Sequence, residues 1–367
     1  MPSTDPKVSE PRATSADRPV RAGRPDSVFM KACRGEPTDY TPIWLNRQAG
    51  RYMPEYHQVK GTTPSLEFFK HPELAARATL DAQRILGVDA AIMFADLLPL
   101  LEPMGLKLDY KPGVGPVFEN PLRHQKDIAA LKVVDARQDT PYIEGIIENI
   151  LSELPPEIAL LGFAGAPFTL ASYAIEGKGS RNYIEVKKLM YTRPGLWDEL
   201  MSKLVDSVAS YVHLQFASGV DAVQLFDSWV GCLCVDDYRR YVAPHTRRLM
   251  TKIRKWGQVT LIYFATDNMH LIDDMYATGP DLMALDWRTP LRETWDRLGS
   301  HAIQGNMDPI VLCADKDTVS REASRILDEV AGKPGHIFNL GHGIVPETPV
   351  ENVKHLVDFV HEYSARS

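Results

Sequence analysis

Two arginines stand four residues apart, Arg47 and Arg51, in the stretch NRQAGRYMPEY that follows a short apolar run. A guanidinium group binds a carboxylate or a phosphate through two parallel hydrogen bonds, and a spacing of four in a loop or a first helical turn lets both groups face one ligand. The alternative is one surface arginine and one ion-paired arginine. The position directly after an apolar run favours a shared anionic ligand.

Other polar residues follow apolar runs in the same way. Asp96 ends AAIMFAD, where a carboxylate can stabilise a donor or a developing cation, or can simply cap the next turn. Tyr173 lies about two turns into a helical segment, as a hydroxyl donor or as a core aromatic. Ser228 follows a run in LFDSWVG. His342 follows another in NLGHGI, and the glycines on both sides of it favour a ligand-facing loop.

Short apolar runs suited to buried parallel strands alternate along the chain with amphipathic helical patterns. The eight runs are Pro42–Leu45, Ala90–Phe94, Ile158–Phe163, Ala222–Phe226, Val259–Phe264, Leu282–Leu285, Ala302–Ile303 and His336–Leu340. The helical patterns are Glu73–Leu86, Pro194–Ala217, Asp236–Trp256, Leu291–Leu298, Thr318–Ala331 and Val350–Ser364. This order predicts an α/β fold, a (β/α)8 TIM barrel in a single domain, rather than an open sheet. No internal repeat is apparent.

In a barrel the downstream ends of the strands meet at one mouth, which is where such folds carry out chemistry. The arginine pair, Asp96 and the later polar residues are therefore expected to converge there. Gly162 lies in the third run and Gly165 follows it, before a helical segment, and we expect both to let a ligand approach the backbone closely. The segment Gly105–Phe118 predicts a β-hairpin inserted after the second strand.

Composition excludes several classes of function. The basic residues are scattered over a chain of formal net charge -7, so no nucleic-acid partner is expected. No apolar run reaches the roughly 18 residues of a membrane helix. The four cysteines fit no disulfide framework and indicate a reducing compartment, the cytoplasm. Residues 1–25 resemble a disordered tail before a domain of residues 26–367. A transit peptide is the alternative, against which the acidic residues of the tail count.

A series of motifs identifies a family. The motifs PIWLNRQAGRYMPEY, DAAIMFADLL, GFAGAPFTLASYAIEG, VQLFDSW, QGNMDP and FNLGHGI, in this order, resemble uroporphyrinogen decarboxylases from about residue 26 onward. The resemblance implies a TIM barrel, a homodimer, and a reaction without metal, organic cofactor or covalent intermediate. It also implies the substrate, uroporphyrinogen III, whose four acetate side chains lose carbon dioxide to give coproporphyrinogen III in haem and porphyrin biosynthesis.

The same resemblance implies roles for individual residues. Arg47 and Arg51 match carboxylate-binding arginines, and Asp96 matches the aspartate that accepts hydrogen bonds from the pyrrole N–H groups. The remaining substrate contacts are the loop residues Gln48, Ala49 and Gly50, together with Tyr173, Ser228 and His342. Lys60 stands where some relatives have a further arginine, and a lysine keeps the charge but loses the fork.

Catalysis is assigned to Asp96 and Arg47. Arginine is a poor acid at neutral pH unless it is strongly desolvated. Arg47 is expected to have one of two roles: it donates the proton, or it organises the reacting carboxylate. Tyr173, His342 and a bound water are the other possible donors.

Two alternative functions remain open from the sequence. A zinc-dependent corrinoid or thiol methyltransferase of the same superfamily would need a His-x-Cys pair and a distant cysteine. Cys232 and Cys234 have no such histidine beside them, so no metal site is expected. A non-catalytic tetrapyrrole-binding protein is the other alternative, and the retained Asp96 argues against it.

Overall fold

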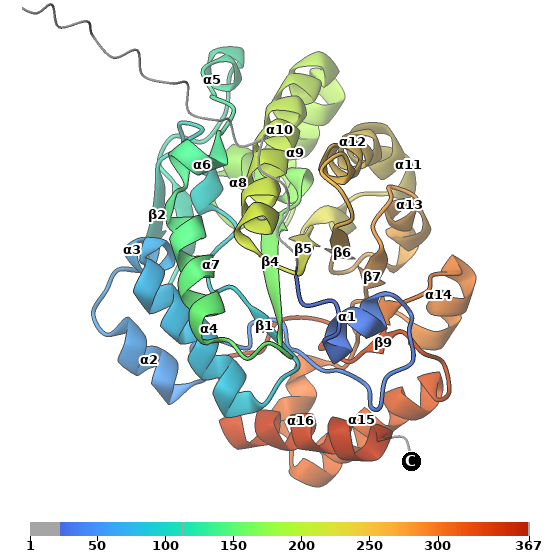
Figure 1. The fold of residues 1–367 in the computed structure, drawn as a ribbon. Helices are drawn as coiled ribbons and strands as arrows, with labels where there is room; N and C mark the ends of the chain where they lie inside the picture. The colour runs from blue at the N-terminus through green and yellow to red at the C-terminus, as the bar shows by residue number, and fades with distance from the viewer. Residues whose placement is uncertain (1–22, 112, 366–367) are drawn as a thin grey trace, which may run out of the picture.

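A computed structural model describes residues 23–111 and 113–365, so most of the expected N-terminal tail, residues 1–25, lies outside it. Seven parallel strands form one curled sheet in the order β1-β4-β5-β6-β7-β8-β9, with helices around it (Figure 1). The strands are β1 (Ala90–Ile92), β4 (Ala159–Gly165), β5 (Ala222–Phe226), β6 (Thr260–Phe264), β7 (Leu282–Ala284), β8 (Ile303–Gln304) and β9 (His336–Ile337). Each falls within or beside one of the expected runs.

The expected first strand, residues 42–45, closes the ring without being a regular strand. Ile43 forms a single parallel bridge with Phe338, and the Phe338 N–H donates to the Pro42 carbonyl at 2.8 Å. On the other side, the Asp89 N–H donates to the Ile43 carbonyl at 2.9 Å. Because Pro42 has no N–H to donate, this segment cannot form a full ladder. The TIM barrel is thus confirmed, with its first strand reduced to one bridge.

The helices also follow the expected order. Those that cover the ring or precede its strands are α1 (Val28–Cys33), α2 (Pro54–Lys60), α3 (Ser65–Lys70), α4 (Pro72–Leu86), α7 (Tyr142–Glu153), α8 (Pro167–Glu176), α9 (Ile184–Thr192), α10 (Pro194–Ser218), α14 (Leu291–Leu298), α15 (Lys316–Val330) and α16 (Val350–Ser364). Short helices α5 (Gln125–Ala129), α6 (Ala136–Asp139) and α13 (Ile272–Tyr276) fill the connections.

One expected helix, residues 236–256, is divided. The structure has α11 (Val235–Asp237), a π-helical turn at Tyr238–Val242 and then α12 (Ala243–Arg254). Pro244 lies in the first turn of α12, where its missing N–H removes one hydrogen bond of a continuous helix. A wider turn before a proline absorbs this loss.

The interior of the barrel is filled by side chains of alternate strand residues. Inward-facing members include Ala90, Ala159, Leu161, Ala222, Ile262, Leu282 and Ile337, all fully buried. Phe29 and Cys33 of α1 belong to the same cluster, so α1 packs against the interior of the ring. The intervening strand residues, such as Leu160 and Val223, face the surrounding helices. This packing fills the ring, so a site is available at the end of the barrel where the carboxyl ends of the strands meet.

A short motif that hydrophobic patterning does not reveal fastens the upstream ends of three strands. Gly-x-Asp occurs at residues 87–89, 219–221 and 279–281, immediately before β1, β5 and β7. The three glycines have φ of 69°, 113° and 105°, a region that favours glycine. Each aspartate accepts a hydrogen bond of 2.7 Å from a backbone N–H of the neighbouring strand or segment, namely Ile43, Leu160 and Leu261. The motif sets the register of adjacent strands.

Asp221, the second of these aspartates, also binds Arg24, near the first residue that the structure describes. The Arg24 backbone N–H donates to Asp221, and the Arg24 guanidinium lies 3.6 Å from the same carboxylate. Arg24, two residues before the domain boundary expected at residue 26, therefore contacts the barrel.

Replacing Asp89 with alanine is expected to lower the free energy of unfolding by about 2–4 kcal/mol, because each buried donor left unpaired costs about 1–3 kcal/mol. Asp89 accepts from the Ile43 N–H at 2.7 Å and from the Tyr40 hydroxyl at 2.8 Å, and it pairs with His361 at 2.8 Å. Chemical denaturation measures the change, with Asp39→Ala, at an exposed position, as the control. Equal stabilities of the two variants would show that Asp89 does not close the ring.

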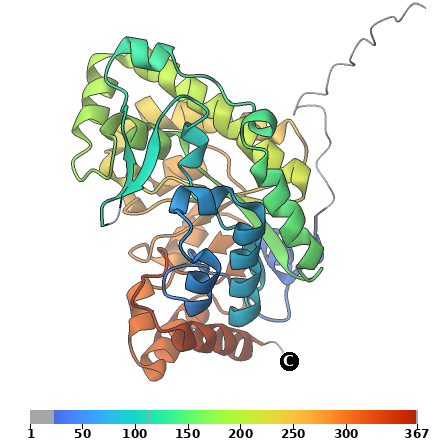
Figure 2. The same ribbon diagram turned by 90° about the vertical axis from the view of Figure 1, so that its left-hand side faces the viewer.

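The expected hairpin is confirmed as β2 (Leu108–Lys111) and β3 (Gly115–Phe118), an antiparallel pair in which Tyr110 faces Pro116. Figure 2 shows it as a separate teal ribbon at the side of the molecule. The Phe118 N–H donates to the Gly177 carbonyl at the end of α8 at 2.7 Å, which ties the hairpin to the barrel. Within residues 23–111 and 113–365, no helix is long and apolar enough to cross a membrane.

Candidate functional site

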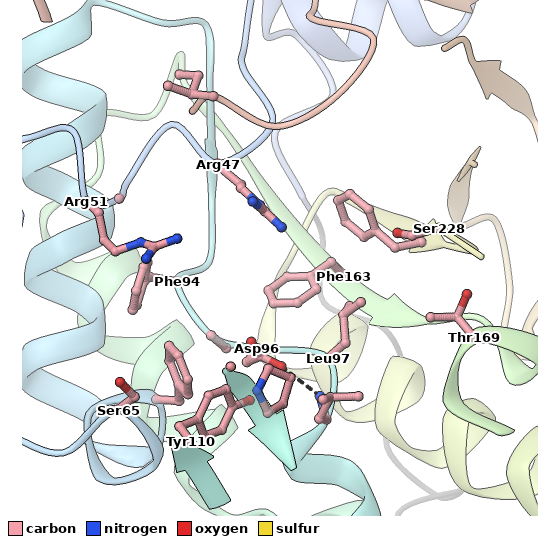
Figure 3. A pocket seen from close by; sticks show the side chains of 18 of the residues that line it. Arg47, Arg51, Ser65, Phe94, Asp96, Leu97, Tyr110, Phe163, Thr169 and Ser228 are labelled. Atoms are coloured by element: carbon pink, nitrogen blue, oxygen red, sulfur yellow. Dashed lines mark hydrogen bonds between the residues drawn. The ribbon is translucent and has the colours of Figure 1, made fainter. Parts of the chain in front are cut away.

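A cavity of about 1060 Å³ opens at the carboxyl ends of the strands. Of the residues expected from the sequence, its wall contains Arg47, Ala49, Gly50, Arg51, Asp96, Tyr173, Ser228 and His342. Figure 3 shows the Arg47 side chain extended toward the centre of the cavity, with Arg51 to one side, Ser228 to the other and Asp96 opposite. Segments that are up to about three hundred residues apart in the chain therefore meet in one place, as the barrel geometry requires.

Arg47 occupies a constrained position in the loop that follows the first barrel segment. Its φ is 63°, in the left-handed region that non-glycine residues seldom adopt. Asn46 fixes the backbone before it: the Asn46 N–H donates to Asn339 Oδ1 at 3.0 Å, and its side-chain amide donates to the Leu340 carbonyl at 3.2 Å. The Ile344 N–H donates to the Asn46 carbonyl at 3.0 Å. The loop is thus tied to the segment that follows β9.

A chain of buried amides supports this loop from inside the barrel. Trp44 Nε1 donates to Gln304 Oε1 at 2.9 Å, and Gln304 Nε2 donates to Gln224 Oε1 at 3.0 Å. Gln224 Nε2 then donates to Asn46 Oδ1 at 3.0 Å. Buried amides are costly unless they are paired, so each member specifies the rotamer of the next. The chain fixes Asn46 and, through it, the direction in which Arg47 leaves the backbone.

The glycines around His342 serve close packing. A Cβ atom on Gly343 would lie 2.4 Å from Cδ of Arg47, and one on Gly341 would lie 2.1 Å from the Trp287 backbone nitrogen. Neither glycine has a positive φ. The turn is tight as expected, but the glycines are needed because the Arg47 side chain and a neighbouring backbone pass directly over it.

Gln48 differs from the expectation made for it. Its side chain is buried behind the loop and does not belong to the cavity wall. Oε1 accepts from the Leu45 N–H at 3.2 Å and Nε2 donates to the Ala90 carbonyl at 3.1 Å. Both ends of the amide are therefore occupied by backbone, and the residue shapes the loop from behind. Lys60 also lies outside the cavity wall, where its amine donates to the Thr63 carbonyl at 2.7 Å.

Gly162 and Gly165 do not lie in the cavity wall either, so the expectation that they bring a ligand to the backbone is wrong. A Cβ atom on Gly162 would lie 2.1 Å from Gln215 Oε1, and one on Gly165 would lie 2.6 Å from Leu170. The Gln215 amide pairs with both backbone groups of Phe163, at 2.8 and 2.9 Å. These glycines make room for helices α10 and α8 against β4.

Asp96 is half-buried and presents its carboxylate to the cavity. Oδ1 accepts a hydrogen bond from the Leu98 N–H at 3.0 Å. Burial raises the pKa of Asp96, whereas the Leu98 N–H, the Tyr110 hydroxyl and the charge of Arg47 each act to lower the pKa. The carboxylate is therefore an acceptor whose charge depends on the groups that surround it.

Tyr173 and His342 are both uncharged at neutral pH. Burial, followed by the charge of Asp96, raises the pKa of Tyr173 to about 12. Burial and the charge of Arg47 lower the pKa of His342. The Tyr173 ring packs against Trp229 with centroids 3.8 Å apart and planes inclined by 30°, which fixes its hydroxyl in the wall. Both side chains suit neutral hydrogen bonding to a ligand better than proton donation.

Several wall residues were not predicted from the sequence, notably Tyr110, Thr169 and Trp229. The buried Asp227, which directly follows β5, lies behind the wall and accepts from the Thr169 N–H at 3.1 Å, the Thr169 hydroxyl at 2.7 Å and the Tyr263 hydroxyl at 2.8 Å. Burial raises the pKa of Asp227 to about 6. Its role is to hold Thr169 in place, and no pattern in the sequence distinguishes it from a ligand-facing aspartate.

The part of the chain that the structure describes contains no group of three or more His, Cys, Asp or Glu side chains placed to bind a metal ion. Cys232 is half-buried, and burial raises the pKa of its thiol to about 11. A metal-binding thiolate needs the opposite shift. The zinc-dependent alternative therefore has no ligand set in the described residues.

Comparison with known proteins gives a consistent result. The family model described as uroporphyrinogen decarboxylase matches residues 24–363. A uroporphyrinogen decarboxylase from Koribacter versatilis is 50% identical over 343 residues, which is 93% of this chain and 97% of that protein. One from Carboxydothermus hydrogenoformans is 46% identical, over 93% of this chain and 98% of that protein.

Among solved structures, a methyltransferase from Methanosarcina mazei superposes with a TM-score of 0.76 at 21% identity, over 92% of this chain and 99% of that one. At this identity the similarity concerns the fold alone.

Proposed function

The chain belongs to the uroporphyrinogen decarboxylase family, and from this premise we propose how its cavity divides the work of the reaction. The chain is a carboxy-lyase that decarboxylates uroporphyrinogen in porphyrin biosynthesis. We assign the side-chain carboxylates of the substrate to Arg47 and Arg51, and the pyrrole N–H groups to Asp96. The observation that carries the assignment is the placement of two guanidinium groups and one carboxylate on different sides of a single cavity.

The chemistry of the substrate explains why a carboxylate is useful there. A pyrrole ring is electron-rich, so a proton can add to the ring carbon beside the acetate-bearing position. The resulting cation accepts the electron pair of the bond between the acetate methylene and its carboxylate, and carbon dioxide leaves. A second proton then adds to the exocyclic methylene carbon, and the ring carbon returns the first. The net change replaces carboxylate by one proton, and the ring itself is the electron sink.

Asp96 acts on the charge that appears during this sequence. The ring carries a positive charge only after protonation, so a carboxylate close to the pyrrole N–H groups binds the cationic intermediate more tightly than the neutral substrate. Such differential binding raises kcat. For this role Asp96 must be ionised, and activity is expected to rise as the pH rises through its pKa.

Arg47 and Arg51 act on the opposite end of the substrate. Guanidinium groups bind carboxylates in a bidentate manner. The substrate carries eight carboxylates around its ring, on four acetate and four propionate side chains. Arg47, fixed at the centre of the cavity, holds the acetate that reacts. Tyr173 and His342, both neutral, supply hydrogen bonds, and Ser228 supplies a hydroxyl group. The proton comes from water or from a group organised by Arg47, and the reaction needs no cofactor.

Replacing Arg51 with alanine is expected to raise KM about tenfold to a hundredfold while lowering kcat by less than about threefold, because one charge-assisted pair is worth about 1.5–3 kcal/mol. Arg51 is exposed at the side of the cavity and so binds carboxylates that do not react. Steady-state kinetics under anaerobic conditions measure both constants. Arg181→Ala, at an exposed position outside the cavity wall, is the control. A larger loss in kcat than in KM would place Arg51 in the chemistry.

We also propose a homodimer that joins through the face around the cavity. Val114 in the cavity wall, Ile184 next to Tyr183 and Met269 near Asp267 are 63%, 56% and 53% exposed, respectively. Apolar side chains gathered around one opening are typical of a contact surface. Analytical ultracentrifugation tests this: a species of twice 41.1 kDa is expected, and a monomer at all concentrations would contradict it.

We propose that the protein acts in the cytoplasm, which cell fractionation would test.

A further inference from the structure

The hairpin β2–β3 brings one side chain into the cavity that the motifs did not indicate. Tyr110 lies on the same inward face of β2 as Leu108. Its ring packs edge-on against Phe69 with centroids 5.4 Å apart. Phe69 in turn contacts Phe94 at 5.7 Å. These aromatic contacts fix the ring, so the hydroxyl group has a defined position in the wall.

That hydroxyl group has no hydrogen bond of normal geometry to any described residue, although its oxygen is inaccessible to solvent. A buried hydroxyl without a partner costs free energy, and such a group is commonly found where a ligand completes the bonding. Figure 3 shows Tyr110 beside Asp96. The two are close enough for each to shift the pKa of the other. Burial and then the Asp96 carboxylate raise the pKa of Tyr110, and the Tyr110 hydroxyl lowers the pKa of Asp96, against the effect of burial.

We propose that Tyr110 is a positioning residue for Asp96: its hydroxyl group donates a hydrogen bond to the carboxylate when the substrate fills the cavity, keeping Asp96 ionised and aimed at the pyrrole N–H groups. The Leu98 N–H already occupies Oδ1 at 3.0 Å and limits how the carboxylate can rotate. The phenol cannot compete as an acid, because its proton is held more tightly than that of an ordinary tyrosine. It therefore remains a donor throughout the reaction.

Binding of the substrate makes this donor necessary. Uroporphyrinogen displaces water from around Asp96, and loss of water favours the neutral carboxylic acid, which cannot stabilise a ring cation. Among the residues that the structure describes, the other ionisable groups that interact with Asp96 are Arg47, Tyr173 and Tyr211. Only Arg47 among these carries a charge at neutral pH, and in the proposed complex its guanidinium is engaged by a substrate carboxylate. The Tyr110 hydroxyl is the donor that can turn entirely to Asp96.

Tyr110→Phe tests the inference, because it removes the hydroxyl and keeps the ring. Tyr142→Phe is the matched control, since Tyr142 is also half-buried but lies on α7 outside the cavity wall. The pH dependence of kcat and kcat/KM for uroporphyrinogen is measured anaerobically, with circular dichroism to confirm the fold. We expect kcat to fall about tenfold to a hundredfold and the acidic limb of the kcat profile to move up by about one pH unit. The direction follows because Asp96 without its donor is protonated at a higher pH.

An unchanged kcat and an unchanged acidic limb in Tyr110→Phe would overturn the inference, and so would a lower kcat with the limb unmoved, because packing alone would then explain the loss. The inference rests on the proposed role of Asp96, and the two can fail separately. If Asp96→Asn retains activity, the role of Asp96 fails. If Asp96→Asn is inactive while Tyr110→Phe behaves like the control, only the role of Tyr110 fails.

Discussion

Asp96→Asn is expected to lower kcat about a thousandfold and to change KM less than about threefold. Asparagine has nearly the same shape and still accepts a hydrogen bond, so the neutral substrate binds much as before. It carries no negative charge, and the positive charge that forms on the pyrrole ring loses its partner. Removing a single preorganised electrostatic group from an active site commonly costs about 10²- to 10³-fold in kcat, and a full charge lies at the upper end.

The measurement is steady-state kinetics under anaerobic conditions, with substrate affinity determined separately by equilibrium binding. Asp109→Asn is the matched control, because Asp109 is exposed on β2 and does not belong to the cavity wall. Turnover near that of the parent protein would remove Asp96 from the mechanism. Loss of binding together with turnover would make Asp96 an anchor and leave the stabilisation of the cation unexplained.

Arg47→Lys is expected to lower kcat/KM about a hundredfold, the second largest effect. Lysine keeps the positive charge but offers a single ammonium group in place of a planar fork, so it cannot fix the orientation of the reacting acetate. The surroundings of Arg47 also fit a guanidinium: its methylene groups pass directly over Gly343, where a Cβ atom would lie 2.8 Å from Arg47 Cγ. A misplaced carboxylate cannot align its bond with the ring orbitals that receive the electrons.

The control for this substitution is Arg321→Lys, at an exposed position on α15 far from the cavity wall. Near-parental kinetics of Arg47→Lys would mean that the site needs only a positive charge at this place. In that case the four-residue spacing of the arginines would serve electrostatic attraction, and bidentate binding of the reacting acetate would be wrong.

The barrel could be predicted because each of its strands is a short, continuous apolar run. Such runs are typical of parallel strands covered on both faces, and seven of the expected eight form regular strands. The first run, residues 42–45, has the same composition, but its proline removes a donor and the ladder stops at one bridge. The expected helix at residues 236–256 is divided because a π-helical turn precedes Pro244. Hydrophobic periodicity does not reveal such a local change of the backbone.

The Gly-x-Asp motif at residues 87–89, 219–221 and 279–281 is visible in the sequence, but it was not predicted to have a role. It lies at the upstream ends of the strands, whereas chemistry is expected at the downstream ends. A carboxylate before a strand acts on structure, because it accepts a hydrogen bond from a backbone N–H near the start of the neighbouring strand or segment and so aligns the two. The three occurrences of the motif therefore support the barrel independently of the hydrophobic runs.

Residues of the cavity wall could be predicted where a polar residue follows an apolar run within a few positions, as Arg47, Asp96, Ser228 and His342 do. The same pattern fails for carboxylates at this kind of position that turn inward, such as Asp227 behind the wall. It also fails for Gln48, whose neighbours in sequence line the cavity while its own side chain turns back to the barrel. Whether a side chain faces the ligand or the core at a strand end depends on the rotamer and on long-range partners.

Tyr110 could not have been assigned from the sequence, because an inserted hairpin has no fixed position relative to the barrel. Its place beside Asp96 results from the contact between Phe118 and Gly177 and from packing on Phe69. These partners lie far from Asp96 in sequence or belong to other elements. Only the folded chain brings them together.

One measurement decides most directly whether the cavity carries out the proposed reaction. The purified protein is incubated anaerobically with uroporphyrinogen III whose acetate carboxyl groups carry an isotopic label, and the labelled carbon dioxide and the tetrapyrrole product are quantified. The proposed mechanism predicts four molecules of carbon dioxide for each uroporphyrinogen, with coproporphyrinogen III as the final product. Substrate that is bound but returned with all four acetates intact would contradict it and would leave the cavity as a tetrapyrrole-binding site without catalysis.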